Sequence, residues 1–499
     1  MNYSAIREYL AKQESNINPA MLAYLSSLSL IAERAPAVAA SIVRELGDQR
    51  NNLKLIASEN YSSPATQLAM GNLLTDKYAE GFPYHRFYAG CQNVDEIESF
   101  ACKRACELFG AEHAYVQPHS GADANMIAFW AILHTRVGSK LLEKFGQTKL
   151  TDLSDAQWAE FRSALGSQKL LGHDYASGGH LTHGYRYNVS AQMFEAHSYT
   201  VSKETGLLDY DQIEAQALEL KPLILLAGYS AYPRALDFRR LREIADKAGA
   251  VLMVDMAHFA GLVAGKVFSG DNNPVEFADV VTSTTHKTLR GPRGGLILCR
   301  KEFAEQVDKG CPLVIGGPLP HVLAAKAVAF SEALSEDFKD YAGKIVLNAK
   351  ALAKACIDEG MQVLTGGTDN HIVLIDVTNF GITGRQAEEA LRECGITLNR
   401  NSIPFDPNGA WYTSGLRLGT PALTTLGMST GEMPEIAAII KLVLTATQPA
   451  VLKSGKPGKS KYQIDDKVKA EARARTGELL RRYPVYPELD LEYLMSQFC

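Results

Sequence analysis

The sequence predicts an α/β fold in which a mainly parallel sheet is accompanied by a smaller second domain. Four short apolar runs have the composition of buried strands, and helical patterns separate them; the runs span residues 114–116, 223–227, 251–254 and 296–299. Strands that alternate with helices in this way form parallel sheets. A chain of 499 residues is also too long for one compact core, which favours two or three domains.

The first 50 residues are predicted to form a helical arm. Residues 21–32 are largely apolar, but acidic residues offset the basic ones that precede them, whereas a secretory signal needs a basic start. The apolar pattern then continues at helical spacing to Ile42 and Leu46. A helical arm therefore explains these residues better than a signal peptide does.

The large domain is predicted over residues 51–334 and the small domain over residues 335–499. Early in the large domain, apolar residues recur every three or four positions from 94 to 109, which indicates an amphipathic helix that ends at Gly110. Residues 138–171 are interpreted as an insertion in this domain.

In the small domain, a strand is predicted near 371–377 and helices near 385–394 and 432–444. The segment 449–465 combines several lysines with glycines and prolines. Such a composition favours a solvated linker over a binding patch.

Composition and charge exclude several classes of protein. The 51 Lys and Arg residues against 56 Asp and Glu residues give a net charge of -5, which argues against a broad nucleic-acid footprint. No uninterrupted apolar stretch reaches the ~18 residues of a membrane span. The eight cysteines are scattered without Cys-x-x-Cys pairs, which predicts reduced thiols and a cytoplasmic protein.

Two polar residues follow predicted strands, where ligands bind to sheets of this kind. Asp255 ends the run at 251–254, and Lys287 lies in a Thr-rich turn after a strand that starts near Asp279. A single lysine is usually solvated. An amine and a carboxylate at two strand ends, however, suit pyridoxal phosphate, because the amine forms a Schiff base and the carboxylate keeps the pyridine nitrogen protonated.

A phosphate site is expected at residues 119–125, between the strand at 114–116 and a helix predicted at 125–133. Backbone N–H groups at a helix N-terminus and nearby hydroxyls bind phosphate, although a Ser-Gly pair in this position is more often a plain helix cap. His180 and His183 could form a zinc pair, but no third ligand has suitable spacing, so no metal site is expected.

Several longer motifs occur in the order found in one known family. The chain resembles serine hydroxymethyltransferase in Lys77-Tyr78-Ala79-Glu80-Gly81, in residues 178–184, in residues 254–258, in residues 284–295 and in residues 413–422. The similarity runs from about residue 53 to residue 485. It implies a PLP-transferase fold similar to aspartate aminotransferase, with helices on both faces of the sheet, and pyridoxal 5'-phosphate as the cofactor.

The resemblance also implies roles around the cofactor. Lys287 would hold it as a Schiff base, Asp255 would pair with the pyridine nitrogen, and His180 would stack on the ring. Further contacts from the same subunit are implied for Ser120, Gly121, Ser230, His258, Thr284 and His286. Contacts from a neighbouring subunit are implied for Tyr78, Gly316 and Gly317.

On the substrate side, Arg417 and Ser58 are implied to bind the carboxylate, Glu80 to carry a proton and Tyr88 to hold the substrate hydroxyl. Arg417 has independent physical support, because a guanidinium can bind a carboxylate through two parallel hydrogen bonds. Without the family, Arg417 could equally form a surface ion pair, Glu80 could be a surface acid and Tyr88 a packed aromatic.

The folate side departs from the family pattern. Leu181 and Asn401 resemble folate contacts, whereas Phe87 stands in place of a tyrosine and Tyr175 in place of a leucine. In the phosphate loop, Ala122 replaces a hydroxyl residue, which removes about 1 kcal/mol of hydrogen bonding. These departures lie on the side of the site where the resemblance places folate.

The resemblance implies reversible transfer of the serine hydroxymethyl carbon to tetrahydrofolate, which gives glycine and 5,10-methylenetetrahydrofolate. It also implies a homodimer with shared active sites, with a tetramer as a further option. The altered folate side leaves open a folate-independent aldolase or an alanine racemase. A catalytically silent binding protein is a third class, which the intact Lys287, Asp255, Glu80 and Arg417 disfavour.

Overall fold

The computed structural model describes residues 4–12 and 17–499. Its centre is a mixed seven-stranded sheet in the order β4-β10-β9-β8-β7-β5-β6. Only β10 runs antiparallel to its neighbours β4 and β9, while the other pairs are parallel. The strands are β4 (His113–Tyr115), β5 (Lys169–His173), β6 (Glu195–Tyr199), β7 (Ile224–Gly228), β8 (Val251–Asp255), β9 (Val280–Thr284) and β10 (Gly295–Cys299). The predicted α/β class with a mainly parallel sheet is confirmed.

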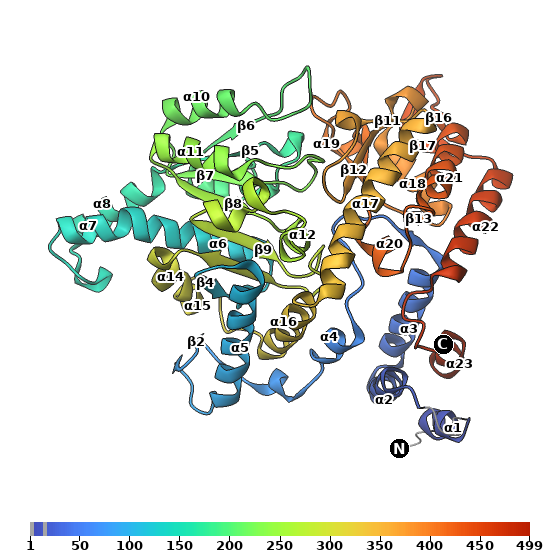
Figure 1. The fold of residues 1–499 in the computed structure, drawn as a ribbon, viewed down its shortest axis with the longest axis horizontal. Helices are drawn as coiled ribbons and strands as arrows, with labels where there is room; N and C mark the ends of the chain where they lie inside the picture. Colours follow the sequence, from blue (N-terminus) through green and yellow to red (C-terminus); the bar gives the residue numbers. More distant parts are fainter. Residues whose placement is uncertain (1–3, 13–16) are drawn as a thin grey trace.

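Helices cover both faces of this sheet (Figure 1). Alternate residues of one strand enter different cores: Leu252 and Val254 of β8 pack in one cluster, and Val251 and Met253 in another. Because successive strand side chains point to opposite faces, a strand covered on both sides is apolar throughout. The first cluster contains residues of α5 (Gln92–Phe109), α11 (Phe238–Ala248) and α16 (Pro320–Ala333), and the second contains residues of α6 (Gly121–Leu133) and α14 (Lys301–Asp308).

Helix boundaries follow local capping signals. α5 ends at Gly110, whose φ of 73° is the left-handed conformation that glycine adopts without strain, as predicted. α6 begins after Ser120, whose hydroxyl accepts a hydrogen bond from the backbone N–H of Asp123 at 3.2 Å. The segment 119–125, where a phosphate site is expected, therefore contains a helix cap in this structure.

A second unit lies beyond the long helix α17 (Glu336–Asp358), which runs between the two halves in Figure 1. Its four-stranded antiparallel sheet has the order β11-β12-β15-β14. Its elements are β11 (Gln362–Val363), β12 (Ile372–Asp376), β14 (Asn399–Asn401), β15 (Gly415–Gly419), α18 (Gly384–Glu393), α21 (Met433–Ala446) and α22 (Asp466–Arg482). Short β1 (Leu53–Lys54) pairs with β13 (Ile396–Thr397), so the first residues of the predicted large domain pack with the small unit.

Further α-helices of the two units are mostly short connections, apart from the 11-residue α10. They are α4 (Pro64–Leu68), α9 (Ser190–Met193), α10 (Tyr210–Leu220), α12 (Ala260–Ala264), α13 (Pro274–Phe277), α15 (Gly310–Leu313), α19 (Gly409–Tyr412) and α20 (Pro421–Thr425). None of the helices described is long and apolar enough to cross a lipid bilayer.

The segment 449–465, predicted as a solvated linker, is largely exposed but contains paired strands that were not predicted. These residues form an antiparallel hairpin of β16 (Gln448–Val451) and β17 (Pro457–Gln463). The buried amide of Gln386 on α18 donates hydrogen bonds to the carbonyl oxygens of Gly458 at 2.9 Å and Lys461 at 2.8 Å. The lysine side chains are exposed to solvent, whereas the backbone of β17 is hydrogen-bonded to α18. The lysine-rich composition therefore did not reveal the pairing of β16 with β17.

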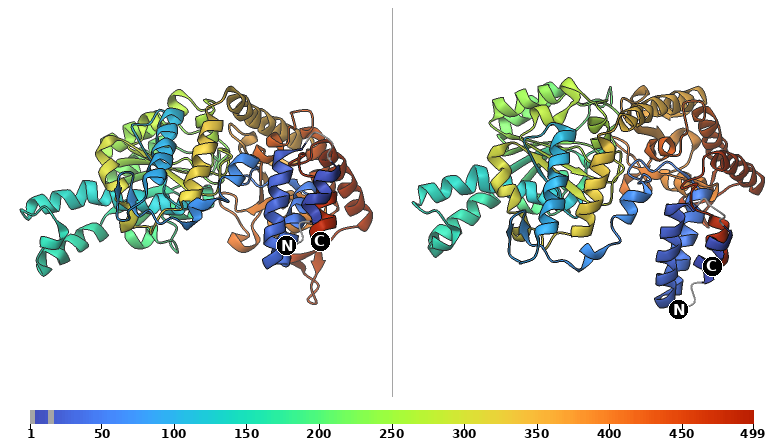
Figure 2. Two further views of the ribbon diagram at one scale, coloured as in Figure 1. Left: turned by 90° about the horizontal axis from the view of Figure 1, so that it is seen from below. Right: turned by 60° about the horizontal axis from the view of Figure 1, so that its bottom comes forward.

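The predicted insertion contains two helices that protrude from the body, α7 (Ser139–Lys144) and α8 (Asp155–Gly166), as Figures 1 and 2 show. Phe161 of α8 is buried, and a Cβ added to Gly138 would lie 3.1 Å from its ring. The last residues of the range, 169–171, already belong to β5 of the central sheet.

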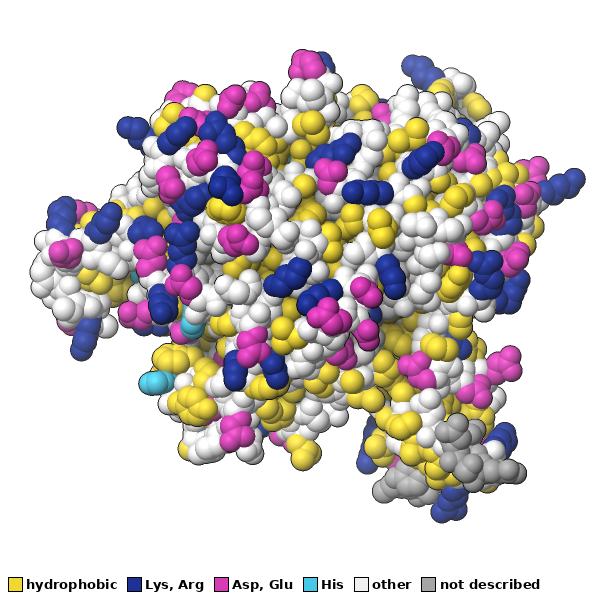
Figure 3. All heavy atoms as spheres, viewed as in Figure 1, with side chains coloured by type: hydrophobic (Ala, Val, Ile, Leu, Met, Phe, Trp, Pro, Cys, Tyr) yellow, Lys and Arg dark blue, Asp and Glu magenta, His cyan; other side chains and the backbone are white. Residues whose placement is uncertain are grey.

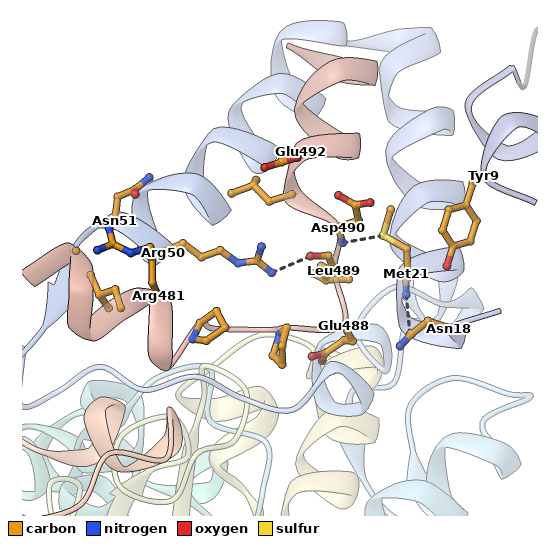
Figure 4. Close-up of a pocket in the computed structure, with 15 residues that line it drawn as sticks. Tyr9, Asn18, Met21, Arg50, Asn51, Arg481, Glu488, Leu489, Asp490 and Glu492 are labelled. Atoms are coloured by element: carbon orange, nitrogen blue, oxygen red, sulfur yellow. Dashed lines mark hydrogen bonds between the residues drawn. The ribbon is translucent and has the colours of Figure 1, made fainter. Parts of the chain in front are cut away.

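The N-terminal arm consists of α1 (Ser4–Lys12), α2 (Pro19–Arg34) and α3 (Pro36–Asn51), and residues 1–3 and 13–16 of it lie outside the described residues. These helices share a hydrophobic cluster with the C-terminal α23 (Leu491–Phe498), and the C-terminus of the chain lies beside them in Figure 2. A groove of about 890 Å³ lies beside this cluster. Figure 4 shows residues that line it, among them Arg50, which donates a hydrogen bond to the carbonyl oxygen of Leu489 at 2.8 Å. On the face drawn in Figure 3, acidic and basic side chains are interspersed.

Candidate active site

A cavity of about 360 Å³ lies between the carboxyl edge of the central sheet and the sheet of the small unit. Loops after β7, β8 and β9 supply Ser230, His258 and Lys287, and β15 supplies Arg417 from the other side. Nine residues singled out in the sequence line this cavity: Ser58, Tyr175, His180, Leu181, Ser230, His258, Lys287, Asn401 and Arg417. Far-apart segments of the chain thus converge at one place.

Asp255 ends β8 as a buried and fully hydrogen-bonded carboxylate. One oxygen accepts from Asn125 Nδ2 at 2.9 Å and lies 3.3 Å from His183 Nε2, and the other accepts from the Ala257 N–H at 3.0 Å. Burial alone would favour the neutral acid, but hydrogen bonding and charge from His183, followed by His180 and Asn125, lower the pKa of Asp255. The group is therefore an anion that can stabilise a positive ring nitrogen.

Lys287 presents a buried amine to the cavity. Its Nζ donates to Thr284 Oγ1 at 3.3 Å. Burial, assisted by the charges of Arg417 and Arg293 and opposed by Asp255, lowers the pKa of Lys287 to about 8. A substantial fraction of the amine is therefore neutral near physiological pH, as covalent capture of an aldehyde requires.

His258 is held by a second histidine that sequence reasoning missed. His258 Nδ1 lies 3.4 Å from Nε2 of His371, and the two buried rings stack with centroids 5.6 Å apart. Burial, with the charges of Lys287 and Arg417 nearby, lowers the pKa of His258 well below its ordinary value. His258 is therefore a neutral imidazole, and the polar start of the strand predicted near 371–377 was the only sequence signal for its neighbour.

Arg417 is a partly buried cation with unused hydrogen-bonding capacity. It donates to the Ser230 carbonyl oxygen at 2.8 Å and to Asn399 Oδ1 at 3.0 Å, while its buried Nε has no partner. Among the described residues, no carboxylate forms an ion pair with it. Burial lowers the pKa of Arg417 only to about 10, so it remains charged. The surface ion pair considered for Arg417 is thus absent from the described part of the chain.

The segments expected to hold a phosphate meet beside Lys287. A Cβ added to Gly121 would lie 2.7 Å from Cγ2 of Thr284, so the helix start approaches the Lys287 turn closely. The buried Nδ1 of His286 has no hydrogen-bond partner in the described structure. With the N-terminus of α6 and Ser120, these groups form a set of donors that fits a phosphate.

A second cluster lies outside this cavity, on and around the short strands β2 (Gly81–Phe82) and β3 (His85–Arg86). Tyr78 OH donates to Glu80 Oε1 at 3.4 Å, the Tyr78 ring packs 4.7 Å from Tyr88, and a Cβ on Gly317 would lie 3.2 Å from Tyr78. Tyr78, Tyr88 and Phe87 are 53%, 45% and 70% exposed. Within one chain, therefore, the cavity is not lined by Glu80, Tyr88, Phe87 or Gly316.

The metal alternative for His180 and His183 receives no support from their contacts. His183 approaches Asp255, and His180 Nδ1 lies 2.8 Å from Thr182 Oγ1. In the part of the chain that the structure describes, no group of three or more His, Cys, Asp or Glu side chains is arranged to hold a metal ion.

The mostly parallel sheet, with a buried lysine and a buried aspartate at its carboxyl edge, defines the class as an enzyme of the PLP-transferase α/β fold. A family model described as serine hydroxymethyltransferase matches residues 31–144 and 152–440. The gap in the match falls between α7 and α8, in the protruding segment.

Full-length relatives agree with the family model. The serine hydroxymethyltransferase of Treponema pallidum (strain Nichols) is 62% identical over 499 residues, which is all of this chain and 87% of the relative. That of Salinispora tropica is 58% identical over 474 residues, covering 95% of this chain and 99% of the relative, and that of Chlamydia trachomatis serovar D is 51% identical over 484 residues, covering 97% of each. The chain belongs to the serine hydroxymethyltransferase family.

Proposed function

We propose that this enzyme transfers the hydroxymethyl carbon of serine reversibly to tetrahydrofolate, giving glycine and 5,10-methylenetetrahydrofolate. The observation that carries the proposal is the cavity that is lined both by the partly buried Arg417, which has no carboxylate partner among the described residues, and by the amine of Lys287. This arrangement suits an amino acid, because its carboxylate can bind the guanidinium while its amino end lies near the lysine. The family membership points to the same reaction.

The cofactor of the proposal is pyridoxal 5'-phosphate, which when bound supplies an electron sink for the negative charge left on Cα of the substrate. Lys287 would hold its aldehyde carbon, and Asp255 its ring nitrogen. His180, Ser230 and His258 line the space for the ring. The phosphate would rest on Ser120, Gly121, Thr284 and His286, where the unpartnered Nδ1 of His286 supports the fit.

The remaining chemistry belongs to residues that orient substrate and move protons. Arg417 and Ser58 bind the serine carboxylate and fix the direction of Cα. Because His258 is neutral, its ring can hydrogen-bond at the site without adding another positive charge. Leu181, Tyr175 and Asn401 also line the cavity, and the first two are partly exposed, so a folate bound against them would approach the serine hydroxymethyl group from solvent. Glu80 would carry the proton.

We infer that a homodimer completes the site. Tyr78, Glu80, Tyr88 and Gly317 cluster outside the cavity of their own chain, and the aromatic members are exposed. An exposed aromatic cluster of this kind suits an interface with a second copy. In the dimer these residues, with Gly316 and Phe87, would face the partner's cavity, where Tyr88 would hold the substrate hydroxyl. A cytoplasmic location is part of the proposal and is supported by the eight unpaired cysteines.

Folate dependence tests the reaction directly. Serine cleavage by the cofactor-loaded enzyme is measured with and without tetrahydrofolate, by following glycine formation. We expect strong acceleration by tetrahydrofolate and none by an oxidised folate, which serves as the control. Equal rates with and without tetrahydrofolate would contradict the proposal and favour a folate-independent aldolase.

A further inference from the structure

Lys326 is a fully buried lysine that lies outside the cavity. It is on α16 with 1% of its surface exposed, and its Nζ donates to the carbonyl oxygens of Val116 at 2.5 Å, Pro118 at 3.0 Å and Gly295 at 2.9 Å. No described carboxylate forms an ion pair with it. Burying a charge without a counter-ion is costly unless hydrogen bonds compensate. Three acceptors match the three donors of an ammonium group, which stays partly protonated although burial lowers the pKa of Lys326 to about 7.

The three carbonyl groups belong to the two segments that surround the phosphate site. Val116 and Pro118 immediately precede Ser120, and Gly295 follows the turn that carries His286 and Lys287. The Gly295 N–H also donates to Pro118 O at 2.8 Å. One ammonium group therefore joins the loop before α6 to the start of β10.

Glycines allow this close approach. A Cβ on Gly294 would lie 2.5 Å from Cε of Lys326, and a Cβ on Gly295 would lie 2.2 Å from the Ser120 carbonyl oxygen. In the same loop between β4 and α6, the side chain of Gln117 donates hydrogen bonds to Glu98 Oε1 at 2.7 Å and to Gly81 O at 2.8 Å. The loop is thus held from both sides by buried side chains.

We propose that Lys326 is a positioning residue that sets the phosphate loop for the cofactor, because its ammonium group fixes the backbone of 116–118 against Gly295. This inference rests on the proposed cofactor. Lys326 would act through the orientation of Ser120 and Gly121 and would not contact the phosphate. Its removal should therefore weaken binding of the phosphate group more than binding of the ring and aldehyde.

The test compares two ligands that differ only in the phosphate. Apoenzyme is titrated with pyridoxal phosphate and with pyridoxal, and bound ligand is followed by absorbance. For Lys326→Met we expect the Kd of pyridoxal phosphate to rise about tenfold or more, since loss of one charge-assisted hydrogen bond to the phosphate weakens binding by about that factor. The Kd of pyridoxal should change much less. The matched control is Lys350→Met, an exposed lysine on α17.

Equal increases in the Kd of pyridoxal phosphate and of pyridoxal, or no change in either Kd, would overturn the positioning role of Lys326. If the methionine variant does not accumulate as folded protein, Lys326→Gln makes the same comparison, because its amide still donates two hydrogen bonds. It should give a smaller loss in the same direction, and an unchanged ratio of the two Kd values would overturn the inference. Failure of the unsubstituted enzyme to bind pyridoxal phosphate would instead refute the proposed function.

Discussion

Lys287 and Arg417 carry the clearest chemical information at the scale of single residues, because both are partly buried basic groups that line one cavity. Their proximity is unfavourable in the free protein, since burial disfavours each charge and Arg417 lowers the pKa of Lys287. Binding of an amino acid relieves this repulsion, because its carboxylate neutralises Arg417. The free-energy cost of holding these two positive groups near each other in the free protein therefore favours binding of the substrate.

The titration of Lys287 predicts how cofactor capture depends on pH. The neutral amine is the nucleophile, so the rate of pyridoxal phosphate uptake by apoenzyme should rise with pH and level off above about 8, the pKa of Lys287. Stopped-flow absorbance measures this rate, and pyridoxal phosphate with free butylamine shows the pH dependence of the ligand itself. A rate that rises only near the pKa of ordinary lysine would contradict the depressed value.

Substitution of Arg417 tests the carboxylate site. Arg417→Ala should raise the KM for serine about 10- to 100-fold, which corresponds to a charge-assisted hydrogen bond of about 1.5–3 kcal/mol. Arg417→Lys should recover only part of this loss, because an ammonium cannot bind two carboxylate oxygens in parallel. Cofactor affinity serves as the internal control and should change little. An unchanged KM in the alanine variant would exclude the assigned role.

Single residues also show which parts of the site could be predicted from the sequence and which could not. The positions of Asp255 and Lys287 at strand ends followed from apolar patterns, and the resemblance supplied Arg417 and His180. His371 and Lys326 were not singled out, because their roles arise from partners more than 100 residues away in the chain. A buried histidine or lysine has no local pattern that separates it from an exposed one.

At the scale of elements, short strands and composition-biased segments were the difficult cases. β7, β8 and β10 were predicted because their residues are almost all apolar. β5 and β6 were not predicted, because polar residues lie within them: Lys and His in β5, and Glu and His in β6. The hairpin of β16 and β17 was also not predicted, because its lysines indicated a solvated segment. Its backbone is anchored by Gln386 on α18, which lies far away in the sequence.

Replacement of Gln386 should loosen this hairpin selectively. Gln386→Leu leaves the carbonyl groups of Gly458 and Lys461 without their buried donor, at a cost of about 1–3 kcal/mol. Local opening should then increase roughly fivefold or more, making the backbone next to the lysines of β17 accessible to trypsin. Limited proteolysis with mass spectrometry locates the cleavage. Glu389→Leu, on the same helix but paired with Arg385, is the control, and equal cleavage in both variants would contradict the anchoring role.

At the scale of the whole molecule, the cavity and the Tyr78 cluster are two halves of a proposed site that one chain does not bring together. The first half lies between the two sheets, and the second lies on the exposed β2–β3 region. The phosphate loop connects them, since Gln117 donates to Gly81 next to Glu80. Each subunit would therefore position its own cofactor and its partner's proton carrier through one buried network.

Mixed dimers test this sharing of sites. Lys287→Ala removes the amine of a subunit's own cavity, and Tyr78→Ala removes a residue that we assign to the partner's cavity. Each homodimer should be nearly inactive, but a hybrid has one site with both residues intact. Random pairing of equal amounts should therefore restore roughly one quarter of the active sites of the unsubstituted enzyme. Refolding the two variants together and separately, followed by assays of serine cleavage, provides the comparison. Sites built within single chains would give no recovery on mixing, because every cavity would then lack one of the two residues.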